Sequence, residues 1–189
     1  LKTAEEIGYP VLIKAVGGGG GKGMRIVTKK SELQSAFERS RSEAASAFGD
    51  DRIFIEKYFA SPHHIEIQIF ADNHGNVVSL GERECSIQRR YQKIIEETPS
   101  PFINATFWDQ LSQYAVEITR ACKYSGAGTV EFMVDKQKNF YFLEMNTRLQ
   151  VEHPITEMVN GIDLVKEQIQ VAAGEKLSFT QDNIKPSGH

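Results

Sequence analysis

The sequence has 189 residues, of which 40% are hydrophobic and 25% charged, and its formal net charge is −3 at pH 7. These values are typical of a globular domain with a sizeable core, and they exclude a disordered tail. A mildly acidic chain without a basic arm argues against broad nucleic-acid binding, because affinity for phosphate backbones comes from clustered Lys and Arg. No apolar stretch approaches the roughly twenty residues that cross a bilayer. We therefore expect neither nucleic acid nor membrane as a partner.

The two cysteines and the two ends of the chain carry further expectations. Cys85 and Cys122 lie far apart and form no C-x-x-C pair, which predicts free thiols in a reduced intracellular setting. Residues 1–7 resemble the last turn of a helix that Gly8 stops, and the final residues NIKPSGH simply end. We therefore expect a fragment, in which any catalytic group supplied from outside is invisible.

The first third of the chain predicts strand, loop, strand and helix. Residues 11–16 and 24–28 are rich in β-branched side chains, and a glycine-rich loop joins them. Ser31 with Gln34 forms a capping-box pattern for a helix that reaches about Phe48. Gly49 then ends that helix, and residues 52–59 predict another strand.

The remainder predicts an α+β fold with mostly antiparallel sheets. Residues 64–72 alternate strictly between isoleucine and polar side chains, so Ile65, Ile67 and Ile69 are expected on one face of a strand and Glu66 and Gln68 on the other. The later expectations are a turn at 72–76 into a strand at 77–82, a polar irregular segment at 82–101, a helix at 107–124, a hairpin of 128–135 with 140–146, and helices at 156–161 and 163–174.

The glycine run is the first candidate site. It is not a P-loop, because Lys22 is followed by Gly23 and no helix comes next. A literal G-x-G-x-x-G match is discounted because a strand follows it. Glycines let backbone N–H groups approach phosphate oxygens, so we favour a hairpin flap over nucleotide phosphates, ordered only with nucleotide; the alternative is a flexible linker.

Two carboxylates are the second candidate. If Gln137 and Lys138 make the hairpin turn, Asp135 lies opposite Phe140 and Glu131 lies opposite Glu144. Like charges that face each other across a sheet are destabilising, unless a cation or a proton lies between them. Asn146 projects from the same face and adds a neutral oxygen, so Mg²⁺ or Mn²⁺ is the expected ion. A solvated polar face is an equal alternative on these residues alone.

Two further segments are ambiguous on their own. Arg148, Gln150 and Glu152 occupy alternate positions, so an extended chain directs all three side chains to one side. A guanidinium, an amide and a carboxylate base on one side suit the binding of a small planar oxyacid. A surface pair of Arg148 with Glu152 is the preferred alternative. The basic run at 86–93 is likewise preferred as a solvated loop over an anion lining.

Taken together, the motifs resemble one family along the whole chain. The segments IKAVGGGGGKGMRIV, FIEKYF, PHHIEIQI, ERECSIQRRYQK, GAGTVEF and FLEMNTRLQVEHPITE occur in the order found in biotin carboxylases, a branch of the ATP-grasp ligases. The resemblance implies an ATP-grasp fold with a small lobe at 1–59 and a large lobe at 60–189, with nucleotide between them. Tyr91 stands where many members carry histidine, so no ribose contact is carried over there.

The resemblance also implies site residues. The ATP-binding positions are Lys14, Gly19, Gly20, Gly21, Lys22, Gly23, Met24, Glu56, Lys57, Phe59, His64 and Gln88. The metal positions are Glu131, Glu144 and Asn146, and the bicarbonate and biotin positions are Lys93, Arg148, Gln150, Val151 and Glu152. Catalysis falls to Glu152 as the base, with Lys93 and Arg148.

The implied chemistry is phosphorylation of bicarbonate by ATP to carboxyphosphate, followed by carboxylation of biotin on a carrier protein. Expected partners are the biotin carboxyl carrier, a carboxyltransferase that acts on an acyl-CoA, pyruvate or urea, and a second copy of the full-length chain. The expected compartment is the cytoplasm or the mitochondrial matrix. The fragment alone is expected to be inactive, because an amino-terminal lysine and a carboxy-terminal arginine of the family lie outside it. A non-catalytic nucleotide-binding module and a carbamoyl-phosphate-synthetase-like ligase are the alternatives.

Overall fold

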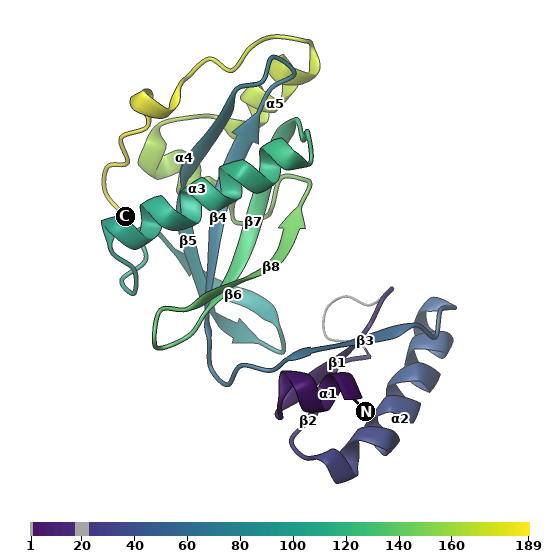
Figure 1. Cartoon of the computed structure of the whole chain (residues 1–189). Coiled ribbons are helices and arrows are strands. Elements are labelled where there is room, and N and C mark those ends of the chain that lie inside the picture. Colours follow the sequence, from purple (N-terminus) through teal and green to yellow (C-terminus); the bar gives the residue numbers. More distant parts are fainter. Residues whose placement is uncertain (1, 18–22) are drawn as a thin grey trace. The chain divides into compact units, whose positions relative to one another are not determined.

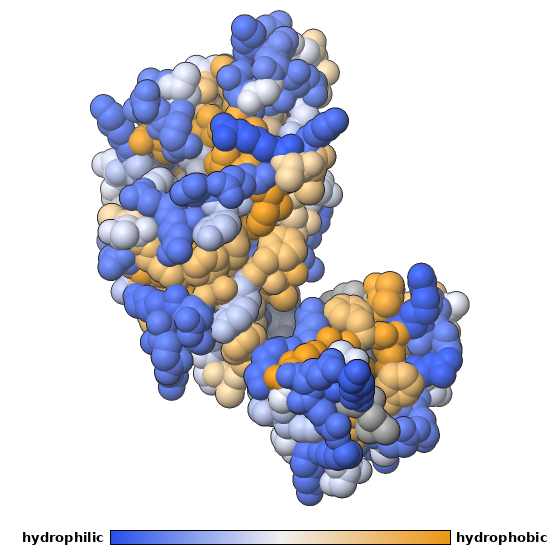
Figure 2. Space-filling model, viewed as in Figure 1, coloured by the Kyte–Doolittle hydropathy of each residue, from blue (hydrophilic) through white to orange (hydrophobic). Residues whose placement is uncertain are grey.

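The computed structural model describes residues 2–17 and 23–189, and the chain divides into two compact units (Figure 1). The first unit comprises the chain up to residue 61 together with 89–92, and the second comprises 62–88 and 93–189. Within the described ranges, no helix has the length and apolar character needed to cross a membrane. On the face that Figure 2 shows, hydrophilic side chains cover much of the surface, as expected for a chain that is one quarter charged.

The first unit is a three-stranded antiparallel sheet with two helices. Its elements are α1 (Lys2–Ile7), β1 (Val11–Ala15), β2 (Arg25–Val27), α2 (Lys30–Phe48) and β3 (Ile53–Lys57). Strand β1 lies in the middle, paired with β2 on one edge and β3 on the other. The strands predicted here are confirmed, and their buried side chains pack against α1 and α2 in a core of Ala4, Val11, Ile13, Val27 and Leu33.

The start of α2 differs from the prediction. Lys29 is the N-cap, and its side chain makes no capping hydrogen bond, so the capping box predicted at Ser31 is wrong. The Glu32 carboxylate instead accepts from the backbone N–H of Thr28 at 3.3 Å and from its hydroxyl at 3.0 Å. The helix therefore starts two residues earlier than a Ser31 cap allows. The predicted end is confirmed, because Gly49 has the left-handed φ of 71°.

The second unit is a five-stranded sheet between helices. Its elements are β4 (His63–Ala71), β5 (Val77–Arg89), β6 (Gln92–Glu97), α3 (Ala105–Ala121), β7 (Gly126–Val134), β8 (Phe140–Asn146), α4 (His153–Asn160), α5 (Leu164–Ala172) and the short helix η1 (Gln181–Asn183). The strand order is β6-β5-β4-β7-β8. Helix α3 crosses the face of the sheet that is nearer the viewer in Figure 1.

The two faces of this sheet differ in chemistry, as the alternation in β4 predicts. Ile65, Ile67 and Ile69 are fully buried under α3, in a cluster that also contains Leu111, Ala115, Val130, Phe132 and Val134. On the other face, Phe70 packs with α5 in a second cluster. Glu66 and Gln68 share that second face and are also fully buried. Polar groups at this depth need partners, and they mark where the candidate site lies.

The prediction of an irregular segment at 82–101 is wrong for its first part. Strand β5 continues to Arg89, a two-residue turn follows, and β6 returns as far as Glu97. Arg90 and Tyr91 form the turn with φ of 51° and 66°. The polar residues of this segment were misleading because several of them are buried in the strand and bonded there, so their polarity does not indicate a solvated loop.

Both long hairpins use the same turn. Asp72 pairs with Asn76 and Asp135 pairs with Asn139, each through a backbone N–H that donates to the asparagine carbonyl at 3.0 and 2.9 Å. The prediction that Asp135 lies opposite Phe140 is therefore wrong, because Val134 lies opposite Phe140. A bulge between Glu131 and Phe132 then shifts the register by one residue. That shift returns Glu131 to the predicted position opposite Glu144.

We predict that Gly128→Ala destabilises the second unit. A Cβ at Gly128 would lie 2.9 Å from both Ile69 Cδ1 and Tyr124 Cε1, and 3.3 Å from the Asn146 carbonyl. Such overpacking costs about 1–3 kcal/mol, which a lower urea midpoint at unchanged slope would show. Gly17→Ala is the control, because its Cβ would meet Phe48 at an ordinary 3.4 Å. Equal midpoints for the two variants would contradict the prediction.

Candidate functional site

A row of four charged residues crosses the second sheet on the face opposite α3. In register, Arg83 on β5 faces Glu66 on β4, Glu66 faces Glu131 on β7, and Glu131 faces Glu144 on β8. Three adjacent carboxylates in one row would repel one another strongly without compensation. Glu66 and Glu131 are buried, whereas Glu144 is exposed at the rim. The prediction that Glu131 and Glu144 share a face is confirmed.

Lys93, near the start of β6, compensates the buried part of this row. Its ammonium donates to Glu66 Oε2 at 2.5 Å, to Glu131 Oε1 at 2.8 Å and to Glu152 Oε1 at 2.7 Å. An ammonium has three N–H donors, so all of them are used on carboxylates. Burial alone lowers the pKa of Lys93, but the Glu66 and Glu131 charges outweigh it and hold the pKa far above its ordinary range. Lys93 is therefore a permanent cation here.

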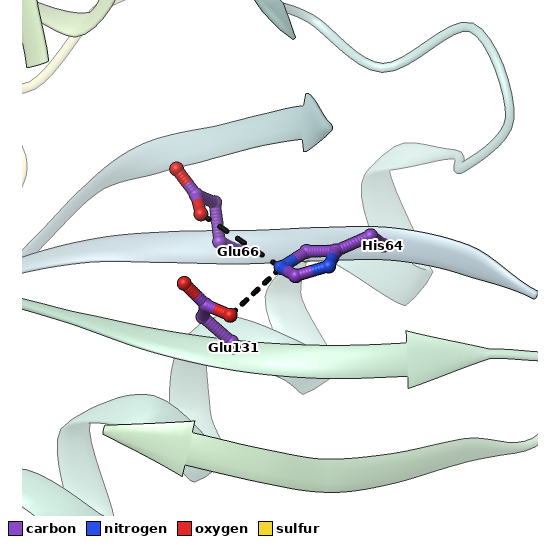
Figure 3. Close-up of side chains that lie close together, drawn as sticks. All are labelled: His64, Glu66 and Glu131. Carbon is purple, nitrogen blue, oxygen red and sulfur yellow. Dashed lines mark ion pairs between the residues drawn. The ribbon is translucent and has the colours of Figure 1, made fainter. Parts of the chain in front are cut away.

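Glu131 is the most heavily bonded carboxylate of the site. Its Oε1 accepts from Lys93, from Asn146 Nδ2 at 2.9 Å and from Gln150 Nε2 at 3.0 Å. Its Oε2 lies 2.9 Å from Nε2 of His64, a contact that is not aligned as a hydrogen bond (Figure 3). Burial alone raises the pKa of Glu131, but His64 and Lys93 lower it to about 2. Glu131 is thus fully ionised at neutral pH.

His64 points between two carboxylates. Figure 3 shows its ring directed at Glu66 and Glu131, and Nε2 lies 4.0 Å from Glu66 Oε2. On the other side of the ring, Nδ1 lies 3.1 Å from Gln88 Nε2. Gln88 also donates to the Cys85 carbonyl at 2.8 Å. Two of the ATP-binding positions implied by the resemblance therefore touch each other.

The basic run at 86–93 divides between two environments. Gln88 and Lys93 reach the buried cluster, whereas Arg89 and Arg90 are exposed. The preference for a solvated loop is therefore wrong for Gln88 and Lys93. Gln88 lies on β5 and Lys93 lies on β6. Predicting these strands would have placed both side chains against the sheet, but the segment was predicted to be irregular.

The segment that links β8 to α4 is not extended, contrary to the expectation for Arg148, Gln150 and Glu152. It turns, and Glu152 becomes the N-cap of α4 with φ of −80° and ψ of 4°. Gln150 and Glu152 still reach the cluster, but Arg148 is exposed and donates to Asn146 Oδ1 at 3.1 Å. Val151 is 92% exposed. In the described chain, Glu152 pairs with Lys93 and not with Arg148, so the preferred surface pair is wrong.

The surroundings of Glu152 favour its ionised form. Burial alone raises the pKa of its carboxyl, but the hydrogen bond from Lys93 is among the effects that bring the pKa below its ordinary value. Its place at the N-terminus of α4 also favours negative charge. Glu152 is therefore ionised at neutral pH.

Several implied ATP-binding positions lie in the first unit. Lys14 on β1 pairs with Glu56 on β3 at 2.5 Å. The Lys57 ammonium donates to the Gly8 carbonyl at 2.8 Å. Gly23 has φ of 72°, and a Cβ there would lie 2.9 Å from Ala15 Cβ, so the hairpin requires glycine. Met24 precedes β2 and Phe59 follows β3. The flap positions Gly19, Gly20, Gly21 and Lys22 lie outside the described residues.

Sequence reasoning missed Glu66 and Arg83 as members of the site. Glu66 was placed on the polar face of its strand, but nothing in the spacing showed that this face is buried. Arg83 lies in the segment expected to be irregular. The available signal was a charge on each of two adjacent strands, since buried charges occur in pairs.

The oxygen-rich rim fits a divalent cation. Counted without His64, the buried carboxylates Glu66 and Glu131 and the half-buried Glu152 outnumber the cations Arg83 and Lys93 by one, and Glu144 adds another negative charge. Carboxylates with an amide are the ligands that Mg²⁺ and Mn²⁺ take. Asn146 Nδ2 donates to Glu131 at 2.9 Å and lies 3.5 Å from Glu144, so the three side chains are neighbours. The Asn146 oxygen accepts from Arg148, so it would face a cation beside the carboxylates only after the amide turns over.

Residues 1–180 match the family described as the ATP-binding domain of the carbamoyl-phosphate synthase L chain, and the chain belongs to that family. Within it, the chain corresponds to the biotin carboxylase segment of biotin-dependent carboxylases, which confirms the resemblance drawn from its motifs.

Three relatives support this assignment. The propionyl-CoA carboxylase alpha chain of Ruegeria pomeroyi is 59% identical over 188 residues, which are 100% of this chain and 28% of that protein. The biotin carboxylase of a Nostoc species is 53% identical over 189 residues, 100% of this chain and 42% of that protein. The biotin carboxylase domain of Hydrogenobacter thermophilus 2-oxoglutarate carboxylase, a dimer solved with MgADP, ADP and bicarbonate, matches with a TM-score of 0.95 at 48% identity, covering 99% of this chain and 41% of that one. The chain therefore spans less than half of each relative.

We predict that Lys93→Met introduces a pH dependence of stability between about pH 8 and about pH 5. In the wild type the lowered pKa values of Glu131 and Glu152 contribute stability above the ordinary carboxyl value of 4.5, and this is lost as the pH falls. Without Lys93 the neighbouring carboxylates repel one another, which raises the pKa values of Glu131 and Glu152. The variant then gains stability as the pH falls from about 8 to about 5.

The measurement is urea unfolding across that pH range. Breaking a buried ion pair costs about 3–5 kcal/mol, so the variant's deficit is greatest at the alkaline end and narrows toward the acidic end. Lys136→Met removes an exposed ammonium and serves as the control. A deficit that stays constant across the range would contradict the proposed charge balance.

Proposed function

We propose that the protein containing this chain is an ATP-dependent biotin carboxylase, which forms carboxyphosphate from ATP and bicarbonate and passes the carboxyl group to protein-linked biotin. The observation that carries the proposal is the contact of Lys93 with Glu152 beside the Glu131, Glu144 and Asn146 rim. This contact of a cation with an ionised carboxylate, next to side chains whose oxygens could hold a metal, supports the proposal.

The bicarbonate end is assigned to Lys93, Arg148, Gln150, Val151 and Glu152. A bicarbonate ion would take over donors that now bind carboxylates, namely the Lys93 ammonium and the Gln150 amide. Glu152 accepts the bicarbonate proton, which leaves a carbonate oxygen free to attack the terminal phosphorus of ATP. The bond from that phosphorus to the ADP oxygen breaks as the new P–O bond forms. The positive charges of Lys93 and Arg148 stabilise the negative charge on the reacting oxygens.

The metal end is assigned to Glu131, Glu144 and Asn146, whose oxygens suit Mg²⁺ or Mn²⁺. A bound ion would neutralise phosphate charge during transfer. The solved relative from Hydrogenobacter thermophilus holds MgADP and bicarbonate together, which supports both ligands for this chain.

The nucleotide is proposed to bind between a small lobe at 1–59 and a large lobe at 60–189. The small lobe would contribute Lys14, Gly23, Met24, Glu56, Lys57 and Phe59, together with the flap residues Gly19, Gly20, Gly21 and Lys22. The large lobe would contribute His64 and Gln88. Expected partners are the biotin carrier, a carboxyltransferase and a second copy of the full-length chain. The relative named above is a dimer.

A nucleotide-binding module without catalysis is the contrasting function. Both functions predict MgATP binding, but only the enzyme requires a base beside Lys93. The buried position of the Glu152 contact favours the enzyme, because an ionised carboxylate held against a cation costs desolvation and contributes nothing to nucleotide binding.

We predict that Glu152→Gln in the complete protein lowers bicarbonate-dependent ADP release by about 10²–10⁴-fold, the usual contribution of a general base. Nucleotide affinity should change little, which isothermal titration with ADP can verify. Glu175→Gln, at an exposed site, is the matched control. An unchanged rate in Glu152→Gln would exclude Glu152 as the base.

We predict that Glu144→Gln weakens Mn²⁺ binding in the presence of ADP by about tenfold or more, at least the loss typical of outer-shell partners. Electron paramagnetic resonance of free Mn²⁺ measures this without turnover. Glu117→Gln on the exposed side of α3 is the control. Equal Mn²⁺ affinity in the two variants would place the metal elsewhere.

A further inference from the structure

Arg83 is a completely buried cation whose donors are all used. Its Nε donates to Glu66 Oε1, one Nη donates to Gln68 Oε1 at 2.7 Å and Thr156 Oγ1 at 2.9 Å, and the other donates to Thr129 Oγ1 at 3.2 Å and Gln150 Oε1 at 3.0 Å. A guanidinium carries five N–H donors in a fixed plane, and each has an acceptor. The partners come from β4, β7, α4 and the turn before α4.

One of these partners, Glu66, contacts the candidate bicarbonate residue Lys93, and another, Gln150, is itself a candidate bicarbonate residue. Glu66 accepts from Arg83 on one oxygen and from Lys93 on the other. Gln150 accepts from Arg83 through its oxygen and donates through its nitrogen to Glu131 at 3.0 Å. Arg83 itself is 0% exposed, so it lies one layer behind the groups that would meet a substrate.

The chemistry of the guanidinium fixes the orientation of the Gln150 amide. Arginine has donors and no acceptor, so the amide must present its oxygen to Arg83 and its NH₂ group to the site. The site side of Gln150 is therefore a donor, which suits an anion. A lysine at this position would keep the charge, but its three donors leave a single flexible nitrogen and cannot hold five acceptors in one plane.

We propose that Arg83 is a positioning residue for the bicarbonate site: it orients the Gln150 amide as a donor and, through Glu66, holds the Lys93 ammonium beside Glu152. This inference rests on the proposed function. Arg83 touches no substrate. It acts by fixing two groups that do, and its effect should therefore fall on bicarbonate rather than on ATP.

The test is Arg83→Lys in the complete biotin carboxylase protein, with bicarbonate-dependent ADP release as the assay. The KM for bicarbonate should rise about tenfold or more, the effect of one lost hydrogen bond to a charged ligand. The KM for ATP should stay within about twofold, a split that general loss of structure would not give. Thr156→Val is the control, because it removes one Arg83 acceptor that touches none of the site residues, and its bicarbonate KM should stay within about twofold of wild type.

Glu66→Gln provides a second route if Arg83→Lys does not fold, because it conserves volume and breaks only the path from Arg83 to Lys93. Its bicarbonate KM should also rise, and the double variant should show less than the product of the two effects. An unchanged bicarbonate KM in either single variant overturns the inference. Absence of bicarbonate-dependent ADP release in the wild type would instead overturn the proposed function, so the two failures are distinguishable.

Discussion

The contact of three carboxylates, two of them buried, with one ammonium is the constraint on which the second unit depends. Glu66, Glu131 and Glu152 each contact Lys93, and isolated charges at this depth would cost many kcal/mol in lost hydration. Lys93 comes from β6, Glu66 and Glu131 come from central strands, and Glu152 comes from the start of α4. The contact therefore joins parts of the chain that are far apart in sequence, and none of them is stable in its observed place without the others.

Hydrophobic burial on the opposite face of the same sheet offsets the free-energy cost of this arrangement. Ile65, Ile67 and Ile69 are buried under α3 without polar groups, so hydrophobic burial on that face stabilises strands whose other face carries charge. Arg83 serves the charged face in a different way from Lys93. It satisfies side-chain acceptors from several elements, and buried polar networks of this kind specify one arrangement rather than adding much net stability.

The sequence predicted most of the fold because its strongest patterns are local. Alternation in residues 64–72 and the helical period of 107–124 gave elements close to those observed. The register of the β7–β8 hairpin was harder. The predicted turn was wrong by one residue at Asp135, and a bulge restored the pairing of Glu131 with Glu144. A bulge depends on packing against the neighbouring strand, which no local pattern reveals.

The site was predictable only in part for the same reason. Glu131, Glu144 and Asn146 share one hairpin, so strand geometry alone brought them together. Arg83 and Glu66 become site residues only once β5, β4 and α4 are packed, and the polarity of residues 82–101 suggested solvent where there is a buried strand. The resemblance supplied roles for Gln88, Lys93 and Glu152, but not the contacts that connect them.

On the proposed function, the bonding of Lys93 also indicates which contact must change when substrate binds. All three ammonium donors are occupied, so an anion can be held only if one carboxylate is released. Glu66 is fully buried and fixed by Arg83, and its release would leave a buried charge with one partner fewer. Glu131 keeps Asn146 and the nearby His64 when Lys93 leaves it. Of the two buried carboxylates, Glu131 is therefore the one whose contact with Lys93 costs less to exchange, and a cation on the Glu131 and Glu144 rim would lower that cost further. On the proposed function, metal binding would then favour bicarbonate binding, because it eases the release of Lys93 from Glu131.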